Sequence, residues 1–450
     1  MYQELALYID GEFLTGGGRL TQDVINPSTL EVLGHLPHAA PEDLQRALHG
    51  AQRAFAQWRH SSPMERSSIL RRVAQLSRDR ADDIAHALTL DQGKPLAEAR
   101  GEILACADHA DWHAEECRRI YGRIVPARKP EVRQMVLREP VGVCAAFTPW
   151  NFPYNQAIRK VCAAIGAGCT LILKGPEDAP SAVMAIARMF HDAGLPPGVL
   201  NVVWGVPAEV SDTLIRSPIV RKVSFTGSVP VGKQLAALAG AHMKRITMEL
   251  GGHSPVLVFD DADVDRAARD LAAFKLRNAG QVCISPTRFY VQAAVHDRFR
   301  DAFIHAMADV RIGDGLDPDT VMGPLAHARR VSAMEGFVED ARMRGGKVLL
   351  GGSRVDRQGY FFEPTVIGEL PDDARLMTEE PFGPIAAIAR FEDPDEAIAK
   401  ANALPFGLAA YAYTRSLSLA HRVSRDVGAG MVNINHFGSA LPETPVGGVK

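Results

Sequence analysis

The sequence predicts an α/β protein built from two doubly wound domains and a protruding β-hairpin. Short apolar segments alternate with helical patterns in two sets, one from Val141 to Ala239 and the other from Val256 to Thr414. Such alternation is typical of parallel sheets covered by helices, with ligands bound at the carboxyl ends of the strands. The length of 450 residues also exceeds what one hydrophobic core usually supports.

The first 118 residues combine a hairpin with helices. A short hairpin is expected around Gly11 and a turn at residues 26–29. Pro41 begins a helix whose apolar residues recur every three or four positions up to Trp58. Further helices are expected over 69–76, 84–90 and 96–117.

Residues 119–138 differ in composition from their surroundings. Two strands flank a basic, proline-containing turn, which indicates a hairpin that either pairs with another subunit or remains on the surface. The change between the two alternating sets falls near Leu250. We therefore expect one domain over 1–118 and 139–250, a second over 251–432, and a hairpin unit of 119–138 joined by 433–450.

The composition excludes several function classes. A net charge of −3 with mixed signs gives no basic surface for nucleic acid or membrane, and the amino terminus lacks an apolar targeting segment. Six cysteines without zinc spacing favour reduced thiols in the cytoplasm and no metal site. His109 and His113 are four residues apart on an expected helix, and we expect them on its solvated face.

Polar residues follow the expected strands, and the functional interpretation of each is weighed against a structural one. Asn151 lies between two prolines and suits an oxyanion donor, although an Asx turn is possible. Lys174 and Glu177 suit a nucleotide ribose or a surface ion pair. The turn at residues 226–233 offers a helix N-terminus to a pyrophosphate, but it is neither a GxGxxG motif nor a Walker loop. Glu249 suits a general base in an apolar crevice.

Cys283 stands in a short polar segment, residues 277–286, between an expected helix ending at Leu276 and a strand beginning at Arg288. A thiol at such a corner can be exposed as a nucleophile, provided that a base or oriented dipoles activate it. Taken alone, a buried structural cysteine is the more common case.

Six motifs occur in the order that the NAD(P)-dependent aldehyde dehydrogenase superfamily shows, and the chain resembles that family over essentially its whole length. They are Pro149-Trp150-Asn151-Phe152-Pro153, Lys174-x-x-Glu177, Phe225-Thr226-Gly227-Ser228, Glu249-Leu250-Gly251-Gly252, Gly280-Gln281-x-Cys283 and Glu380-Pro381-Phe382-Gly383-Pro384. The resemblance implies an aldehyde dehydrogenase-like fold. It makes 1–118 and 139–250 the NAD-binding domain, 251–432 the catalytic domain, and the hairpin an oligomerisation element of a homodimer or homotetramer.

The resemblance also implies roles for single residues. Cys283 is the nucleophile, Asn151 and the Cys283 backbone N–H hold the oxyanion, and Glu249 activates the water that hydrolyses the thioester. The implied cofactor is NAD, with NADP possible, because the Glu177 carboxylate repels a 2′-phosphate. The residues implied in cofactor binding are Trp150, Lys174, Glu177, Gly227, Ser228, Glu380 and Phe382.

Arg159 and Arg277 match the positions at which succinate-semialdehyde dehydrogenases clamp the substrate carboxylate. A guanidinium meets a carboxylate through two hydrogen bonds, so the pair predicts a small acidic semialdehyde such as succinate semialdehyde. Glutarate semialdehyde, sulfonated aldehydes and neutral aldehydes remain alternative substrates. Residues 436–442 correspond to the loop in which the relatives carry a substrate-binding serine, but the loop sequence differs here and leaves the role of Ser439 open. Ser285 stands where some relatives have a second cysteine, so a disulfide switch is not expected.

Other activities are less favoured. A CoA-acylating dehydrogenase usually lacks a base at the position of Glu249. A cysteine esterase needs a Cys/His dyad, which the sequence does not show. A catalytically silent relative would not need Cys283, Glu249 and Asn151 together.

The chain ends at Lys450, where family members continue through a glycine-rich loop and a final strand. We therefore expect a longer protein, whose quaternary state the sequence leaves open.

Overall fold

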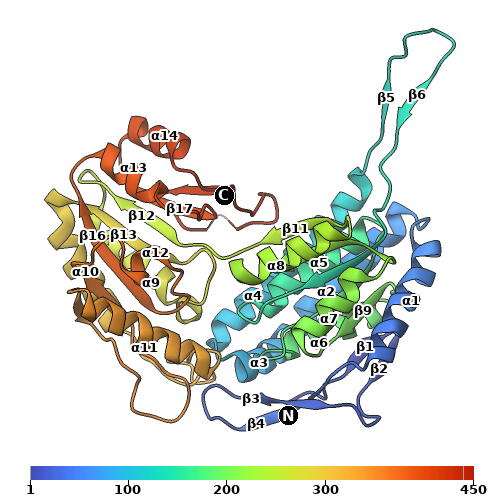
Figure 1. The fold of residues 1–450 in the computed structure, drawn as a ribbon, viewed down its shortest axis with the longest axis horizontal. Coiled ribbons are helices and arrows are strands. Elements are labelled where there is room, and N and C mark those ends of the chain that lie inside the picture. Colours follow the sequence, from blue (N-terminus) through green and yellow to red (C-terminus); the bar gives the residue numbers. More distant parts are fainter. Residues whose placement is uncertain (1, 439) are drawn as a thin grey trace. The chain divides into compact units, whose positions relative to one another are not determined.

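The computed structural model describes residues 2–438 and 440–450, so the expectation for Ser439 lies outside the described residues. The chain divides into two compact units (Figure 1). Unit 1 comprises Met1–Ile25, Val32–Asp91 and Ala99–Met248, and unit 2 comprises Asn26–Glu31, Gln92–Glu98 and Glu249–Lys450. Two short segments from the amino-terminal part of the chain thus belong to the carboxyl-terminal unit. No sequence pattern indicated this exchange.

Unit 1 is organised around a seven-stranded sheet. Its order is β11-β10-β7-β8-β9-β1-β2, and β10, β7, β8 and β9 run parallel, whereas β1 and β2 form an antiparallel edge. The strands are β1 (Leu7–Ile9), β2 (Glu12–Leu14), β7 (Val143–Phe147), β8 (Thr170–Lys174), β9 (Leu200–Val203), β10 (Val220–Thr226) and β11 (Arg245–Glu249). Every residue of β7, β8 and β9 is buried, which explains why these strands are mostly apolar.

Helices of unit 1 pack on this sheet or on one another. They are α1 (Pro41–Trp58), α2 (Pro63–Asp79), α3 (Ala81–Gln92), α4 (Leu96–Glu116), α5 (Pro153–Gly166), α6 (Ser181–Asp192), α7 (Pro207–Arg216) and α8 (Val229–Ala241). Proline in the first turn of α1, α2, α5, α7 and α8 presets the helical φ where no backbone donor is needed. A separate ribbon, β3 (Thr21–Ile25) with β4 (Val32–Pro37), was not predicted.

The expected hairpin is present as β5 (Arg123–Val125) paired antiparallel with β6 (Gln134–Val136). Figure 1 shows it standing away from the helices of unit 1. Its apolar side chains are largely in water: Ile124 is 76% exposed and Met135 is 68% exposed. Such exposure is typical of a surface that another protein chain covers.

Unit 2 contains a second seven-stranded sheet, ordered β14-β15-β16-β13-β12-β17-β18 and parallel except for β14. The strands are β12 (Ser254–Val258), β13 (Pro286–Gln292), β14 (Lys347–Leu350), β15 (Thr365–Gly368), β16 (Ile385–Phe391), β17 (Ala409–Tyr413) and β18 (Met431–Ile434). The helices are α9 (Val264–Leu276), α10 (His296–Ala308), α11 (Ala328–Met343), α12 (Arg375–Thr378), α13 (Pro394–Asn402) and α14 (Leu417–Asp426). The sequence indicated the five central strands but neither edge strand.

The two doubly wound sheets confirm the predicted fold class. Among the described residues, no helix is both long and apolar enough to cross a bilayer.

Candidate active site

Cys283 lies in unit 2, in the loop that joins α9 to β13, as the helix and strand patterns predicted. The loop begins with three consecutive residues in the left-handed region, Asn278 (φ 48°), Ala279 (φ 52°) and Gly280 (φ 70°). Glycine adopts this conformation freely and asparagine with little strain, but alanine at this φ costs about 1 kcal/mol. Local strain of this kind needs support from the surrounding structure, and it is common at functional sites.

Residues 92–98, which belong to unit 2, support the strained start of the Cys283 loop. The Glu98 carboxylate accepts a hydrogen bond from the Asn278 backbone N–H at 2.9 Å, and the Gln92 amide donates to the Asn278 side chain at 2.9 Å. Gln281 is buried, and its side-chain oxygen accepts from the backbone N–H of Ala326 at 3.0 Å. These contacts hold the start of the Cys283 loop in one conformation. Sequence reasoning missed Gln92 and Glu98 because they lie about 190 residues before Cys283.

The exposure of Cys283 distinguishes it from the other five cysteines, which are all buried. Cys283 is half-buried, as a nucleophile requires. Desolvation raises the pKa of its thiol to about 12, and the negative charges of Glu380 and Glu249 contribute to this shift. The thiol is therefore protonated at neutral pH and needs a proton acceptor before it can attack.

Two glycines allow a carboxylate and the cysteine loop to approach closely. The Gly252 N–H donates to the Glu380 carboxylate at 3.1 Å, and a Cβ atom added at Gly251 would lie only 2.1 Å from that carboxylate. A Cβ atom at Gly252 would lie 2.6 Å from the Cys283 carbonyl oxygen. The Glu249-Leu250-Gly251-Gly252 motif thus brings β11's last residue, the Glu380 loop and the Cys283 loop together. A side chain at Gly252 would clash with backbone, whereas one at Gly251 would displace the Glu380 carboxylate.

Gly280 makes a comparable close approach, and its replacement gives a direct test of the loop geometry. A Cβ atom there would lie 2.1 Å from the carbonyl oxygen of Gly383, at a φ of +70°. Gly280→Ala must therefore displace either the Cys283 loop or the loop after Glu380. We expect kcat/KM to fall roughly 100-fold, since small displacements of reacting groups have costs of this order. The readout is the absorbance at 340 nm of the reduced nicotinamide cofactor that the resemblance implies.

The matched control is Gly240→Ala in α8, because a Cβ atom at Gly240 meets no atom within 4 Å. This variant should keep wild-type activity, and alanine stabilises an exposed helix position. Equal activity of the two variants would contradict the requirement for close packing at Gly280.

Two basic side chains, Lys275 and Arg330, lie near Glu380. Burial raises the pKa of its carboxyl group to about 7, while the Gly252 N–H, Arg330 and Lys275 oppose that rise. Lys275 is fully buried, its Nζ donates to Ser285 Oγ at 3.3 Å, and burial lowers its pKa to about 7. Arg330 donates to the carbonyl oxygen of Phe382 at 3.1 Å and lies over its ring. The sequence did not single out Lys275 or Arg330.

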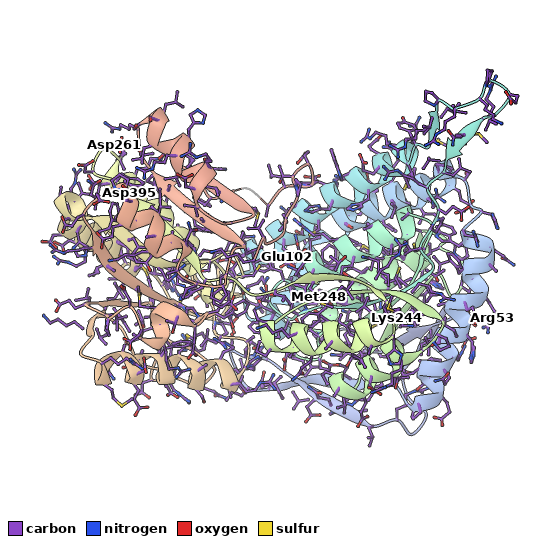
Figure 2. The ribbon with its side chains drawn as sticks, turned by 45° about the horizontal axis from the view of Figure 1, so that its top comes forward. Arg53, Glu102, Lys244, Met248, Asp261 and Asp395 are labelled. Carbon is purple, nitrogen blue, oxygen red and sulfur yellow. The ribbon has the colours of Figure 1, made fainter. Side chains whose placement is uncertain are left out.

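In unit 1, Trp150 and Asn151 lie between the end of β7 and the start of α5. Asn151 is buried and Trp150 is half-buried. The first turn of α5 is fixed by Glu102 of α4, labelled in Figure 2, whose carboxylate accepts from the Asn155 backbone N–H at 2.9 Å. Negative charge at a helix N-terminus is favourable, and here it fixes the helix that follows Asn151. Glu102 was missed, although it interrupts the apolar face of α4.

Arg159 of α5 has a partner that corrects one expectation. Its guanidinium donates to His109 Nε2 at 2.7 Å. His109 is buried, not on a solvated helix face as predicted, because it lies on the same face of α4 as the core residue Cys106. Burial, with the nearby Arg159 charge, lowers the pKa of His109 to about 4, so the imidazole is neutral and can accept. The hydrogen bond with His109 therefore fixes the orientation of the Arg159 guanidinium within unit 1.

The remaining cofactor candidates of unit 1 follow the carboxyl ends of its parallel strands. Lys174 ends β8 and forms an ion pair with Glu177, which also accepts from the Gly205 N–H at 3.3 Å. After β10, a Cβ atom at Gly227 would lie 2.4 Å from the Phe225 ring, so a larger residue there would displace that ring. Ser228 then precedes α8 without a side-chain cap, which leaves backbone N–H groups available to a phosphate. This donor set fits a dinucleotide.

Comparison with known proteins establishes the family. The sequence model of the aldehyde dehydrogenase family matches residues 14–450. This chain belongs to the aldehyde dehydrogenase family. It is an oxidoreductase of the aldehyde-oxidising class, whose members use NAD or NADP.

Several dehydrogenases are similar to this chain over most of their length. A 4-(hydroxymethyl)benzenesulfonate dehydrogenase of Comamonas testosteroni is 46% identical over 450 residues, which cover 100% of this chain and 94% of the relative. The NADP-dependent succinate-semialdehyde dehydrogenase of Escherichia coli K12 is 42% identical, with coverage of 100% and 93%. The crystal structure of succinate-semialdehyde dehydrogenase from Burkholderia pseudomallei matches with a TM-score of 0.97 at 41% identity, covering 99% of this chain and 92% of that one.

Proposed function

We propose that this aldehyde dehydrogenase oxidises a small aldehyde with a distal anionic group, of which succinate semialdehyde is an example, to the carboxylate with NAD. The observation that carries the proposal is the half-buried Cys283, held in a strained loop and influenced by the carboxylates of Glu249 and Glu380. A half-buried thiol beside acid groups suits covalent catalysis followed by hydrolysis.

The proposed roles follow the chemistry step by step. The Cys283 thiolate attacks the aldehyde carbon, and the Asn151 amide with the Cys283 N–H stabilises the resulting oxyanion. When bound, the cofactor accepts the hydride that leaves this carbon, and a thioester on Cys283 remains. Glu249 removes a proton from a water molecule, which attacks the thioester and releases the carboxylate and the thiol. Water supplies the second product oxygen, so atoms and electrons balance.

We assign NAD as the preferred cofactor on the position of Glu177. Its carboxylate lies just beyond the parallel strand β8, where it can accept from two ribose hydroxyls and repel a 2′-phosphate. Lys174, paired with Glu177, offers the competing attraction for a phosphate. Parallel assays with NAD and NADP test this assignment, and a higher kcat/KM with NADP would overturn it.

The Glu380 carboxylate is assigned to the second ribose, and its raised pKa gives a pH prediction. Above a pH of about 7 the group is ionised and accepts from the ribose hydroxyls, whereas below that pH it is protonated. The kcat/KM for NAD should therefore fall as the pH decreases through about 7. Glu380→Gln should show a low kcat/KM without this acidic limb, measured from pH 5.5 to 8.5. An unchanged limb in the variant would assign the titration to another group.

Arg277 is the proposed anion-binding residue of unit 2, because it is exposed and lies at the end of α9, six residues before Cys283. The relatives are named for molecules with a sulfonate or a carboxylate, which a guanidinium binds equally well. Arg159, oriented by His109, is proposed as the second such residue.

Arg277→Met should raise KM for succinate semialdehyde about 10- to 100-fold, which corresponds to the loss of a charged hydrogen bond. KM for butyraldehyde, of the same length but neutral, should change less than threefold. The matched control is Arg269→Met, which removes an exposed arginine from the same helix. Equal effects of Arg277→Met on both aldehydes would remove the anion-binding role.

The test of the whole proposal is NADH formation from succinate semialdehyde, glutarate semialdehyde and butyraldehyde without CoA. Higher kcat/KM for both acidic aldehydes would support it. A requirement for CoA would favour the acylating alternative, and ester hydrolysis without cofactor would favour the esterase.

We also propose that the β5–β6 hairpin pairs with another subunit in a homodimer or homotetramer, because its apolar side chains are exposed. Size-exclusion chromatography with light scattering tests the quaternary state. A monomer at micromolar concentration would contradict the proposal.

A further inference from the structure

Four aromatic rings form a continuous series within unit 2, which begins at the Cys283 loop and which we call the aromatic ladder. The Tyr411 hydroxyl donates to the carbonyl oxygen of Ile284, the residue after Cys283, at 2.6 Å. The Tyr411 and Phe274 rings are 5.6 Å apart and meet edge to face. Phe437 stacks on Phe274 at 4.9 Å, and His436 follows at 5.8 Å.

Burial decreases along the aromatic ladder. Tyr411 is 1% exposed and Phe274 is 3% exposed, whereas Phe437 is half-buried and His436 is exposed. The inner contact is tilted by 74°, but the outer two contacts are nearly parallel, at 20° and 24°. The series therefore begins in the core and ends at the surface with stacked rings. A further planar ring can extend such a stack favourably.

The ladder is close to the groups that are proposed to bind and react with the substrate. Phe274 belongs to the last turn of α9, three residues before Arg277. Burial raises the pKa of the Tyr411 hydroxyl, the Cys283 charge raises it further, and the Arg277 charge lowers it. The charges of Cys283 and Arg277 thus both act on the Tyr411 hydroxyl. One small region of unit 2 therefore contains a nucleophile, a cation and an exposed stacked aromatic surface.

We propose that the preferred substrate is an aldehyde attached to an aromatic ring that carries a carboxylate or a sulfonate. This inference rests on the proposed function and narrows its substrate class. The ring stacks on Phe437 and His436, the anionic substituent binds Arg277, and the aldehyde carbon reacts with Cys283. The reaction balances as oxidation of the aldehyde by NAD with water as the oxygen source, giving an aromatic carboxylate, NADH and two protons.

Two physical arguments favour a ring over a four-carbon chain. The ring gains stacking with the ladder, which an aliphatic semialdehyde cannot make. A ring also fixes the separation between the aldehyde and the anion, whereas a flexible chain loses rotational freedom on binding. Both arguments predict a difference in kcat/KM between substrates of equal charge.

The experiment compares 4-formylbenzoate, 4-formylbenzenesulfonate, succinate semialdehyde and benzaldehyde, with NAD and the full chain. For the wild type, we expect kcat/KM to be at least about 10-fold higher for the two ring acids than for succinate semialdehyde. Phe437→Leu keeps the apolar contact with Phe274 but removes the stacking. It should lower kcat/KM for the ring acids about 3- to 10-fold and change that for succinate semialdehyde less than twofold.

Phe406→Leu is the matched control, because Phe406 is also a half-buried phenylalanine of unit 2 but contacts His253 instead of the ladder. It should leave the substrate ratio unchanged. Preference of the wild type for succinate semialdehyde, or an equal loss for all substrates in Phe437→Leu, would overturn the inference and leave the proposed function intact. Oxidation of benzaldehyde as efficient as that of the ring acids would instead overturn the anion recognition on which the proposed function depends.

Discussion

Replacing Cys283 with alanine is expected to lower kcat by at least about 1,000-fold, because the variant lacks the thiol that is proposed to form the covalent intermediate. The other five cysteines are buried, so none of them can substitute. The half-buried side chain is small, and its loss should leave the fold intact. The measurements are NADH formation, thermal unfolding and the quenching of tryptophan fluorescence by NAD.

Binding of NAD separates the role of Cys283 from a structural role. The residues proposed to bind the adenosine part lie in unit 1, and the loop support by Gln92 and Glu98 does not involve the thiol. The Kd for NAD should therefore change less than threefold in Cys283→Ala. Cys117→Ala, which removes a buried thiol of unit 1, is the matched control and should keep full activity. Retention of a tenth of the activity by Cys283→Ala would refute the assignment.

The sequence predicted the parts of the fold that depend on local pattern. The strands β7, β8 and β9 are buried on both faces, so they are mostly apolar and easily recognised. The edge strands β14 and β18 were missed because their residues are only partly buried and their pattern is weaker. The exchange of segments 26–31 and 92–98 into unit 2 depends on contacts distant in sequence, which no local pattern encodes.

The candidate site was predicted where a residue type is unusual in its local context. Glu249 ends β11, whereas Cys283 and Glu380 lie in the loops before β13 and β16, and each of the three has a glycine within three residues; such positions are typical of functional residues. Lys275 was not predicted, because a lysine in an amphipathic helix normally extends to the surface. It lies four residues after Leu271 on the buried face of α9, and this position was the available signal.

His109 shows the same limitation. Its spacing from Cys106 places it on the core face of α4, but a histidine pattern alone does not reveal an arginine partner 50 residues later. A polar residue within an apolar stripe is therefore better evidence of a buried hydrogen bond than of a solvated face. Glu102 follows the same rule, since it lies on that face and caps α5.

Glu249→Gln is expected to lower the steady-state kcat about 100- to 10,000-fold, which is the usual contribution of a general base. Glutamine keeps the size of the side chain but cannot remove a proton from water. In the proposed mechanism, the thioester and NADH form before any water reacts, so a rapid burst of about one NADH per Cys283 should persist. Stopped-flow absorbance at 340 nm with a high enzyme concentration measures the burst and the slow phase together.

The burst distinguishes two possible roles of Glu249, because its carboxylate influences the Cys283 thiol and could also accept the proton of that thiol. If Glu249 acts only on water, the amplitude of the burst is unchanged and only the slow phase decreases. If it also deprotonates Cys283, whose pKa is about 12, the rate of the burst decreases as well and recovers as the pH rises. Glu379→Gln, which removes an exposed carboxylate paired with Arg375, should alter neither phase. Wild-type turnover in Glu249→Gln would exclude both roles and would return the CoA-acylating chemistry, which needs no water-activating base, to consideration.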